Sequence, residues 1–164
     1  MERSEQQREV IRTPIGELLL VADDDGLTEI HFRVEDRQSC LSGKGQARLP
    51  VLHKTIQQLN EYFEGKRKTF DVPLSLKGTS FQLECWLALQ RIPFGATATY
   101  GEIARTIGRP AAVRAVGAAN GANPIPIIVP CHRVIGSNGS LTGFGGGIDV
   151  KRWLLDFESG SRRL

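Results

Sequence analysis

Apolar and alternating runs fill the first third of the chain and predict a β-rich beginning. Three runs have this pattern: Glu9–Thr13, Glu17–Ala22 and Thr28–Arg33. The turn sequence Pro-Ile-Gly at residues 14–16 separates the first two, and an Asp-rich turn that ends at Gly26 separates the last two. The pattern therefore predicts three short strands joined by turns.

A helical spacing follows these strands. In Arg48–Glu64, apolar residues recur at helical spacing, and Gly65 marks the end of the predicted helix. The Gly- and Ser-containing stretch Ser39–Gln46 is predicted as a loop, and Thr69–Leu74 as one more strand. We therefore expect residues 1–78 to form a small α/β domain with no obvious chemistry of its own.

Beyond this domain the pattern becomes helical. Thr79 and Gln82 have the spacing of a capping box ahead of an apolar helix, which should end near Ile92–Gly95. Thr99 and Glu102 repeat this spacing and predict the start of a second, short helix.

Two further helices follow from the same signals. The short helix should run through Ile107 and close at Gly108. Pro110 is suited to the first position of the next helix, Ala111–Asn120. The last helix, about Ile148–Phe157, has one apolar face, made of Val150, Trp153, Leu154 and Phe157. The fold class predicted for the whole chain is α+β.

The mainly helical domain, residues 79–164, contains a helix pair typical of a helix-turn-helix motif. In its second helix, Arg114 is the one long side chain among small residues. A helix that reads bases in the major groove needs several polar side chains, so sequence-specific readout is disfavoured. Small side chains instead allow close backbone approach, and on DNA such a helix would recognise backbone and shape. A tightly packed core helix with a solvated Arg114 is the alternative.

Composition narrows the class of protein. Apolar residues make up 40% and charged residues 24%, values ordinary for a soluble globular protein. No apolar stretch approaches the roughly 20 residues of a membrane-spanning helix, and the polar N-terminus does not look like a signal peptide. The three widely spaced cysteines, Cys40, Cys85 and Cys131, fit free thiols in a reducing compartment. We therefore expect a cytoplasmic protein that does not contact a membrane.

Charge is distributed unevenly along the chain. Residues 1–78 carry 12 Lys or Arg and 13 Asp or Glu, whereas residues 79–164 carry 9 and 5. The basic excess lies in the half that contains Cys131. This excess is compatible with a polyanionic partner and too small to demonstrate one.

A cysteine stands directly before a histidine, at Cys131-His132, after a proline-punctuated apolar run over residues 124–130. A thiol is a strong nucleophile only as the thiolate, and a neighbouring imidazole or cation lowers the thiol pKa toward neutrality. Prolines fix φ and remove backbone donors, so we expect the run to be rigid and extended. A buried cysteine acting as a small apolar residue is the alternative, which polar His132 and Arg133 disfavour.

The histidine needs a suitable geometry to act as a base. Adjacent side chains of an extended segment point to opposite faces, so either the chain turns at this point or a water molecule links imidazole and thiol. A base also needs an orienting partner, commonly a carboxylate. The nearest in sequence are Asp149, Asp156 and Glu158, and spacing does not choose among them. The Cys-His pair alone equally suggests a thiol protease.

Around this cysteine the sequence resembles one family specifically. The run Asn123–Val134, Asn-Pro-Ile-Pro-Ile-Ile-Val-Pro-Cys-His-Arg-Val, closely resembles the active-site motif of the methylated-DNA-protein-cysteine methyltransferases, the 6-O-alkylguanine-DNA alkyltransferases. The resemblance is strong over about residues 79–158 and general in the N-terminal third. Further matching stretches are Thr99–Ala104, Arg114–Gly117, Gly143–Gly147 and Lys151–Glu158.

The resemblance implies a fold and a reaction. A ribonuclease-H-like N-terminal unit would precede a winged-helix-like domain with the helix-turn-helix. In DNA repair, Cys131 would take the alkyl group from the exocyclic oxygen of guanine, with alkylthymine an open second substrate. The base would be flipped out, because a stacked base hides that oxygen from a protein thiol. No second nucleophile adjoins Cys131, so the protein would act once and be consumed.

The resemblance also implies roles for individual residues. His132 would deprotonate Cys131 through a water molecule, and Glu158 would orient His132. Tyr100 would donate a proton to the leaving guanine, and Asn123 would hold the active-site turn.

Arg114 would occupy the place of the flipped base, on a helix in the minor groove of double-stranded DNA. Further DNA contacts are expected from Thr99, Ala112, Ala115 and Gly117. The base pocket would be framed by Val134, Phe144, Gly145 and Gly146. Position 144 is Phe where many relatives have Tyr, so one hydroxyl is absent from this pocket.

No cofactor or metal is implied, because His31, His53, Cys40 and Cys85 are scattered and do not form the paired ligands of some relatives' zinc site. We expect a monomer and leave cooperative assembly on DNA open. Two other classes stay as alternatives. One is a helix-turn-helix module that binds DNA or a lesion without catalysis. The other is a thiol hydrolase with a triad of Cys131, His132 and Glu158.

Overall fold

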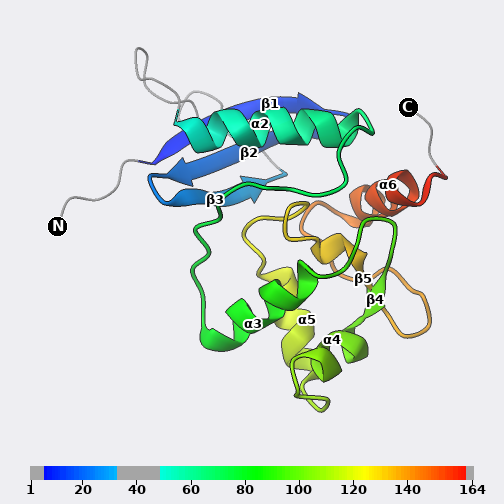
Figure 1. Ribbon diagram of the computed structural model, residues 1–164. Coiled ribbons are helices and arrows are strands. Elements are labelled where there is room, and N and C mark those ends of the chain that lie inside the picture. Colours follow the sequence, from blue (N-terminus) through cyan, green and yellow to red (C-terminus); the bar gives the residue numbers. More distant parts are fainter. Residues whose placement is uncertain (1–5, 33–48, 162–164) are drawn as a thin grey trace. The chain divides into compact units, whose positions relative to one another are not determined.

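The computed structural model describes residues 6–32 and 49–161 of the chain. The chain divides into two compact units, Met1–Leu76 and Lys77–Leu164. Strands open the first unit and helices dominate the second, so the predicted α+β class is confirmed (Figure 1). The predicted loop Ser39–Gln46, with its cysteine, lies outside the described residues.

Three antiparallel strands form the sheet of the first unit. They are β1 (Gln7–Thr13), β2 (Gly16–Asp23) and β3 (Gly26–His31), paired in that order. The predicted strands are confirmed in place and order, with small shifts at their ends. The last residue predicted for the third strand, Arg33, lies outside the described residues.

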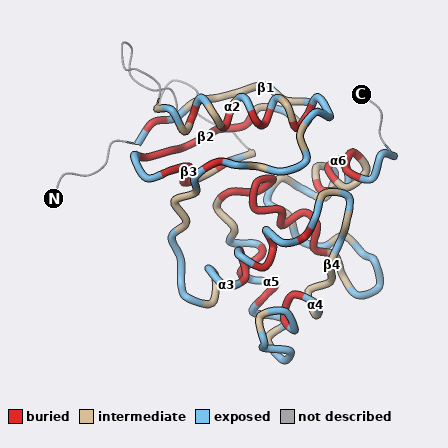
Figure 2. The backbone as a smooth tube through the Cα atoms, in the orientation of Figure 1, coloured by how far each residue is buried: buried red, intermediate tan, exposed pale blue. Residues whose placement is uncertain are grey.

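Helix α2 (Pro50–Phe63) packs along this sheet and confirms the predicted helix with slightly shorter ends (Figure 1). Its first residue is a proline, whose fixed φ suits that position. One side of the helix is buried, which reflects the apolar spacing in the sequence (Figure 2).

The strand predicted over Thr69–Leu74 is wrong. A single bridge, between Leu27 and Leu74, stands in its place. Pro73 has no N–H and cannot extend a ladder, although its carbonyl accepts from the Leu27 N–H at 2.9 Å. The close approach depends on Gly26, where a Cβ would lie 2.5 Å from the Pro73 oxygen.

Two capped helices open the second unit. Before α3 (Ser80–Leu89), Thr79 Oγ1 accepts from the Gln82 N–H at 3.1 Å, and Gln82 Oε1 accepts from the Thr79 N–H at 3.0 Å. This confirms the predicted capping box. Before α4 (Tyr100–Thr106), the Thr99 hydroxyl accepts from the N–H three residues on, at 3.1 Å.

Helix α5 (Val113–Gly121) begins later than predicted. Pro110 is not its first residue, because the Ala112 N–H donates to the Arg109 carbonyl at 2.9 Å and closes a separate turn. The predicted helix pair is therefore present, with a longer connection between its members.

The second unit also contains elements that the pattern did not predict. Strands β4 (Ala98–Thr99) and β5 (Val134–Ile135) pair in parallel and are too short to leave a periodic signal. Helix α6 (Ile148–Ser159) extends two residues past its predicted end, so Glu158 lies within it. Gly160, with φ of +81°, ends this helix in the left-handed conformation.

The core of the second unit surrounds the segment that carries the cysteine. All residues from 125 to 134 are buried, and Figure 2 shows the buried stretches of this unit in red. Trp86 is buried as well, and its indole N–H donates to the Ala119 carbonyl at 2.9 Å, which joins α3 to α5. No helix among the described residues is long and apolar enough to cross a membrane.

Candidate active site

The chain turns immediately before and at Cys131. The expectation of an extended run over residues 124–130 is wrong. Ile127 has a φ of +74°, and the Val129 N–H donates to the Ile125 carbonyl at 2.9 Å. Prolines fix φ but leave ψ free to fold back, which explains the difference. Residues Cys131–Arg133 then form one 3₁₀ turn, so the chain is not extended at Cys131 and His132.

The side chain of Asn123 spans the turn over residues 125–129, which precedes the cysteine. Its amide nitrogen donates to the Val129 carbonyl at 2.7 Å, and its amide oxygen accepts from the Ile125 N–H at 3.0 Å. Both hydrogen bonds tie the two arms of the turn to one residue. The backbone that leads to the cysteine is therefore held in a fixed conformation.

The thiol of Cys131 is buried, with 4% of the residue exposed. Burial raises the pKa of Cys131 to about 11, and the hydrogen bond from Asn123 and the charge of Lys151 oppose this rise only in part. The expectation that a neighbouring imidazole or cation brings the thiol pKa toward neutrality is therefore wrong for the free protein. Desolvation outweighs the nearby polar groups, so the resting cysteine is a neutral thiol.

His132 and Glu158 form a buried pair. The imidazole Nε2 lies 2.8 Å from Glu158 Oε2, and the side chains are 0% and 1% exposed. Burial alone would raise the pKa of Glu158, but hydrogen bonds from His132 and Arg133 lower that pKa to about 2. Burial lowers the pKa of His132. At neutral pH the pair is therefore a carboxylate and a neutral imidazole.

The charge states fix the tautomer of His132. A carboxylate only accepts hydrogen bonds, so Nε2 carries the imidazole hydrogen and donates it to Glu158. Nδ1 is then a free lone pair, and this buried atom has no hydrogen-bond partner among the described residues. The residue that follows Cys131 in the chain therefore carries a ring nitrogen that is able to accept a hydrogen. Of the three carboxylates that spacing left open, the structure brings Glu158 to the histidine, whereas the Asp149 side chain is fully exposed.

Sequence reasoning missed two buried cations at this site. Arg133 donates to both Glu158 oxygens, from Nε at 2.7 Å and from Nη2 at 2.9 Å. Lys151 Nζ donates to the carbonyls of Val134, at 2.6 Å, and Thr142, at 2.9 Å. A signal for Lys151 existed, because it falls seven residues before Glu158, in line with the apolar stripe of α6.

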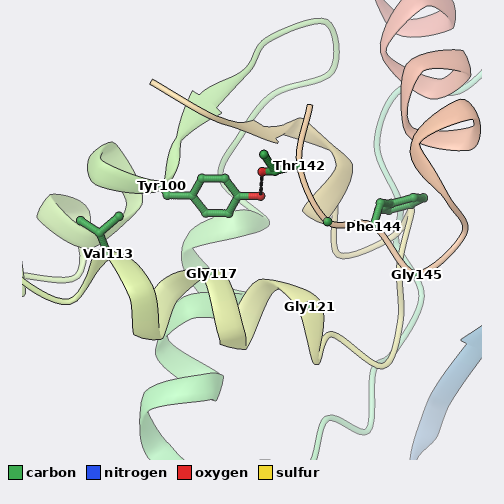
Figure 3. Close-up of a pocket in the computed structure, with 8 residues that line it drawn as sticks. Tyr100, Val113, Gly117, Gly121, Thr142, Phe144 and Gly145 are labelled. Atoms are coloured by element: carbon green, nitrogen blue, oxygen red, sulfur yellow. Dashed lines mark hydrogen bonds between the residues drawn. The ribbon is translucent and has the colours of Figure 1, made fainter. Parts of the chain in front are cut away.

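A cavity of about 560 Å³ is lined in part by Thr142, the residue whose carbonyl accepts from Lys151 (Figure 3). Tyr100 projects across it, and its hydroxyl lies 3.0 Å from Thr142 Oγ1. Val134 and Cys131 are buried and are not among its lining residues. Lys151 nevertheless connects the two regions, because it donates both to the Val134 carbonyl and to the carbonyl of Thr142, which lines the cavity. The full lining comprises Tyr100, Val113, Gly117, Gly121, Thr142, Gly143, Phe144 and Gly145.

Helix α5 presents small residues and one arginine at the surface. Arg114 and Ala115 are exposed, whereas Val116 and Asn120 on the other side are buried. Ala112 and Thr99, also expected at a DNA surface, are half-buried near the helix starts. One side of α5 therefore belongs to the core, and the other offers a shallow face from which Arg114 can project.

A buried thiol, followed in the chain by an imidazole that a carboxylate orients, is an arrangement typical of cysteine-dependent enzymes. Family models match both units of the chain. The ribonuclease-like domain of 6-O-methylguanine DNA methyltransferase matches residues 7–76, and the DNA binding domain of that protein matches residues 80–160. The chain belongs to the 6-O-methylguanine DNA methyltransferase family.

Individual relatives agree with this membership. The methylated-DNA–protein-cysteine methyltransferase of Methanosarcina acetivorans is 46% identical over 157 residues, which cover 91% of this chain and 96% of the relative. The constitutive enzyme of Bacillus subtilis is 47% identical over 150 residues, covering 89% and 91%.

Solved structures agree as well. The Mycobacterium tuberculosis O6-methylguanine methyltransferase has a TM-score of 0.84 and 45% identity, covering 97% of this chain and 96% of that one. The crystal structure of M. tuberculosis OGT in complex with DNA has a TM-score of 0.81 and 48% identity, covering 94% and 93%. The resemblance found in the sequence is confirmed. The activity of this protein is DNA repair by alkyl transfer to a protein cysteine, and the non-catalytic module and the thiol hydrolase are not favoured.

Proposed function

We propose that Cys131 is the acceptor of the alkyl group and that His132 is the base that deprotonates it. The observation that carries this proposal is the buried, unpartnered Nδ1 of His132, on the residue that follows the cysteine. A water molecule between thiol and Nδ1 would relay the proton. Glu158 holds the opposite ring nitrogen and so orients the base.

The transfer is one displacement at carbon. The sulfur forms a bond to the alkyl carbon as the bond from that carbon to guanine O6 breaks, and the oxygen keeps the electron pair. The thiol proton passes to His132 and then to solvent. Tyr100, at the cavity, gives a proton to the departing guanine and is reprotonated from solvent. In the net reaction the thiol therefore loses a proton and the guanine gains one. No second nucleophile adjoins the thioether in the chain to remove the alkyl group from the sulfur, so each protein molecule acts once.

The raised pKa of the thiol fits this scheme. A thiol with a pKa of about 11 stays protonated at neutral pH and reacts poorly with electrophiles that reach it by chance. Proton removal by His132 is then needed during attack on the bound base. An acceptor that is spent in one reaction benefits from such inertness.

The substrate we propose is double-stranded DNA with an alkylated guanine, bound through the minor groove. The small-residue face of α5 permits close backbone approach, and exposed Arg114 can enter the stack in place of the flipped base. Flipping costs a few kcal/mol, which the inserted arginine and phosphate contacts offset. The cavity lined by Tyr100, Gly117 and Phe144 is where we place the flipped nucleotide. A free thiol requires a reducing compartment, and a DNA substrate requires access to the chromosome. We therefore place the protein in the cytoplasm.

Intact mass spectrometry after incubation with a duplex that contains 6-O-methylguanine tests the assignment. We expect a gain of one methyl group, mapped to the peptide that contains Cys131. Cys131→Ser should lose transfer and keep DNA binding, whereas the matched control Cys85→Ser, at another buried cysteine of the unit, should keep both. A methyl group on Cys85, or turnover without any mass gain, would refute Cys131 as the acceptor.

A further inference from the structure

Arg133 is anchored by three groups, and its residue is 5% exposed. Its Nε and Nη2 donate to the two oxygens of Glu158, at 2.7 and 2.9 Å. Its Nη1 donates to the Ile92 carbonyl at 2.7 Å, and its guanidinium lies 5.9 Å from the centre of the Phe94 ring. The side chain therefore spans from the cysteine turn to the segment after α3 and to helix α6.

Glu158 Oε2 is shared between two donors. It accepts from Arg133 Nη2 at 2.9 Å and lies 2.8 Å from His132 Nε2. A two-pronged contact from a planar guanidinium prevents rotation of the carboxylate. The direction in which Glu158 presents its oxygen to the imidazole is thus set by Arg133.

We propose that Arg133 is a positioning residue for alkyl transfer, which holds Glu158 as an ionised acceptor and so keeps His132 Nδ1 unprotonated. The proposal rests on the role of His132 as the base. Arg133 itself does not need to contact the substrate. It acts through Glu158 and through its own charge.

Loss of the guanidinium charge can have two outcomes, and in each of them His132 loses the lone pair on Nδ1. If Glu158 stays ionised, its unbalanced charge favours the imidazolium form of His132, in which both ring nitrogens carry hydrogen. If Glu158 instead takes up a proton, its O–H donates to Nε2, and the neutral ring then carries its hydrogen on Nδ1. In both cases Nδ1 cannot accept the thiol proton.

The charged and titratable groups that face His132 support this reasoning. From α6 these are Glu158 and Lys151, and from the 3₁₀ turn Cys131–Arg133 it is Arg133. Burial is the largest influence and lowers the pKa of His132; Glu158 raises it, whereas Arg133 and Lys151 lower it. Removal of Arg133 leaves Lys151 as the one cation that opposes protonation in this set.

Two variants separate charge from geometry. Arg133→Gln removes the charge and keeps a donor toward Glu158, whereas Arg133→Lys keeps the charge and loses the two-pronged contact. Arg152→Gln is the matched control, because Arg152 lies on α6 in an exposed ion pair with Asp149. The readouts are the single-turnover transfer rate against pH and the ¹⁵N NMR signals of His132 in the free protein.

We expect the acid limb of the Arg133→Gln profile to move up by about one pH unit, so the rate at the acid end falls about tenfold and recovers toward high pH. Arg133→Lys should lower the rate by a factor that does not change with pH, because the charge is kept and only the two-pronged contact is lost. Arg152→Gln should match the wild type. A wild-type pH profile for Arg133→Gln, with an unchanged His132 tautomer, would overturn the proposal.

The wild-type protein provides a test that does not depend on how the variants fold. Its His132 should show hydrogen on Nε2 and a bare Nδ1 at neutral pH. Hydrogen on Nδ1 would overturn the proposal directly. Because NMR reads the free protein, this failure is distinct from failure of Cys131 to become methylated, which would instead refute the proposed function.

Discussion

The side-chain amide of Asn120 donates to the carbonyl oxygen of Cys131, with 3.4 Å between nitrogen and oxygen. Asn120 is buried and lies on α5, the helix that also carries Arg114. The helix that we place against DNA therefore has a direct hydrogen bond to the backbone of Cys131, the acceptor that we propose.

Asn120→Ala should weaken this connection. The change leaves the buried Cys131 carbonyl without this donor, so we expect unfolding to become easier by about 1 kcal/mol. Transfer should slow while DNA affinity stays the same, since the backbone of the cysteine loses a support. Denaturant unfolding and single-turnover assays measure both. Asn138→Ala, in the loop after β5, is the control, and equal effects of the two variants would contradict the connection.

Thr142→Val should slow transfer without weakening DNA binding. The valine keeps the size of threonine and removes the hydroxyl that lies 3.0 Å from the Tyr100 hydroxyl, so Tyr100 loses its anchor above the cavity. A loss of about 1 kcal/mol corresponds to roughly fivefold in rate. Thr142→Ser keeps the hydroxyl and should restore the rate. If serine and valine behave alike, the hydrogen bond has no role in transfer.

Arg114→Ala should reduce transfer from duplex DNA more than transfer from the free modified base. The exposed side chain is proposed to replace the flipped base, and a free base needs no flipping. Rates on the two substrates measure the difference, and binding of unmodified duplex at two salt concentrations gives the phosphate contribution. Equal losses on both substrates would argue against insertion of Arg114 into the stack.

Cys131 should react slowly with iodoacetamide at neutral pH and faster as pH rises toward about 11. Peptide mapping after short exposures gives the rate at this residue. The same shift affects stability with a definite sign. From about pH 9 to 11 the thiol ionises in the unfolded chain and not in the folded one, so the free energy of unfolding should fall by about 3 kcal/mol. A reactivity midpoint near 9 would show that the thiol is solvated.

Acid should destabilise the second unit in two stages. The pKa of His132 is lowered by burial, so below about pH 6.5 the unfolded chain takes up a proton that the folded protein does not. The pKa of Glu158 is lowered to about 2, so its contribution is complete above about pH 4.5 and is lost as pH falls toward 2. Urea unfolding across this range should show both stages, and Glu158→Gln should lack the lower one.

Local chemistry was sufficient for much of the fold. The capping box of Thr79 and Gln82 and the period of α6 are properties of neighbouring residues, and both predictions were confirmed. Predictions failed where distant segments decide. The stretch Thr69–Leu74 met Leu27 with one bridge, and the run before Cys131 folded back on itself around Asn123.

By itself, the sequence determined the class of protein, the helices and strands with strong periodic or capping signals, and the motif that contains Cys131 and His132. Tertiary structure decided which carboxylate contacts His132, the burial of Lys151, and the protonated state of the thiol. These depend on desolvation and on hydrogen bonds between residues far apart in the chain, such as His132 and Glu158, which are 26 positions apart. Neither effect leaves a local pattern, because each arises only when the folded chain excludes water from the site.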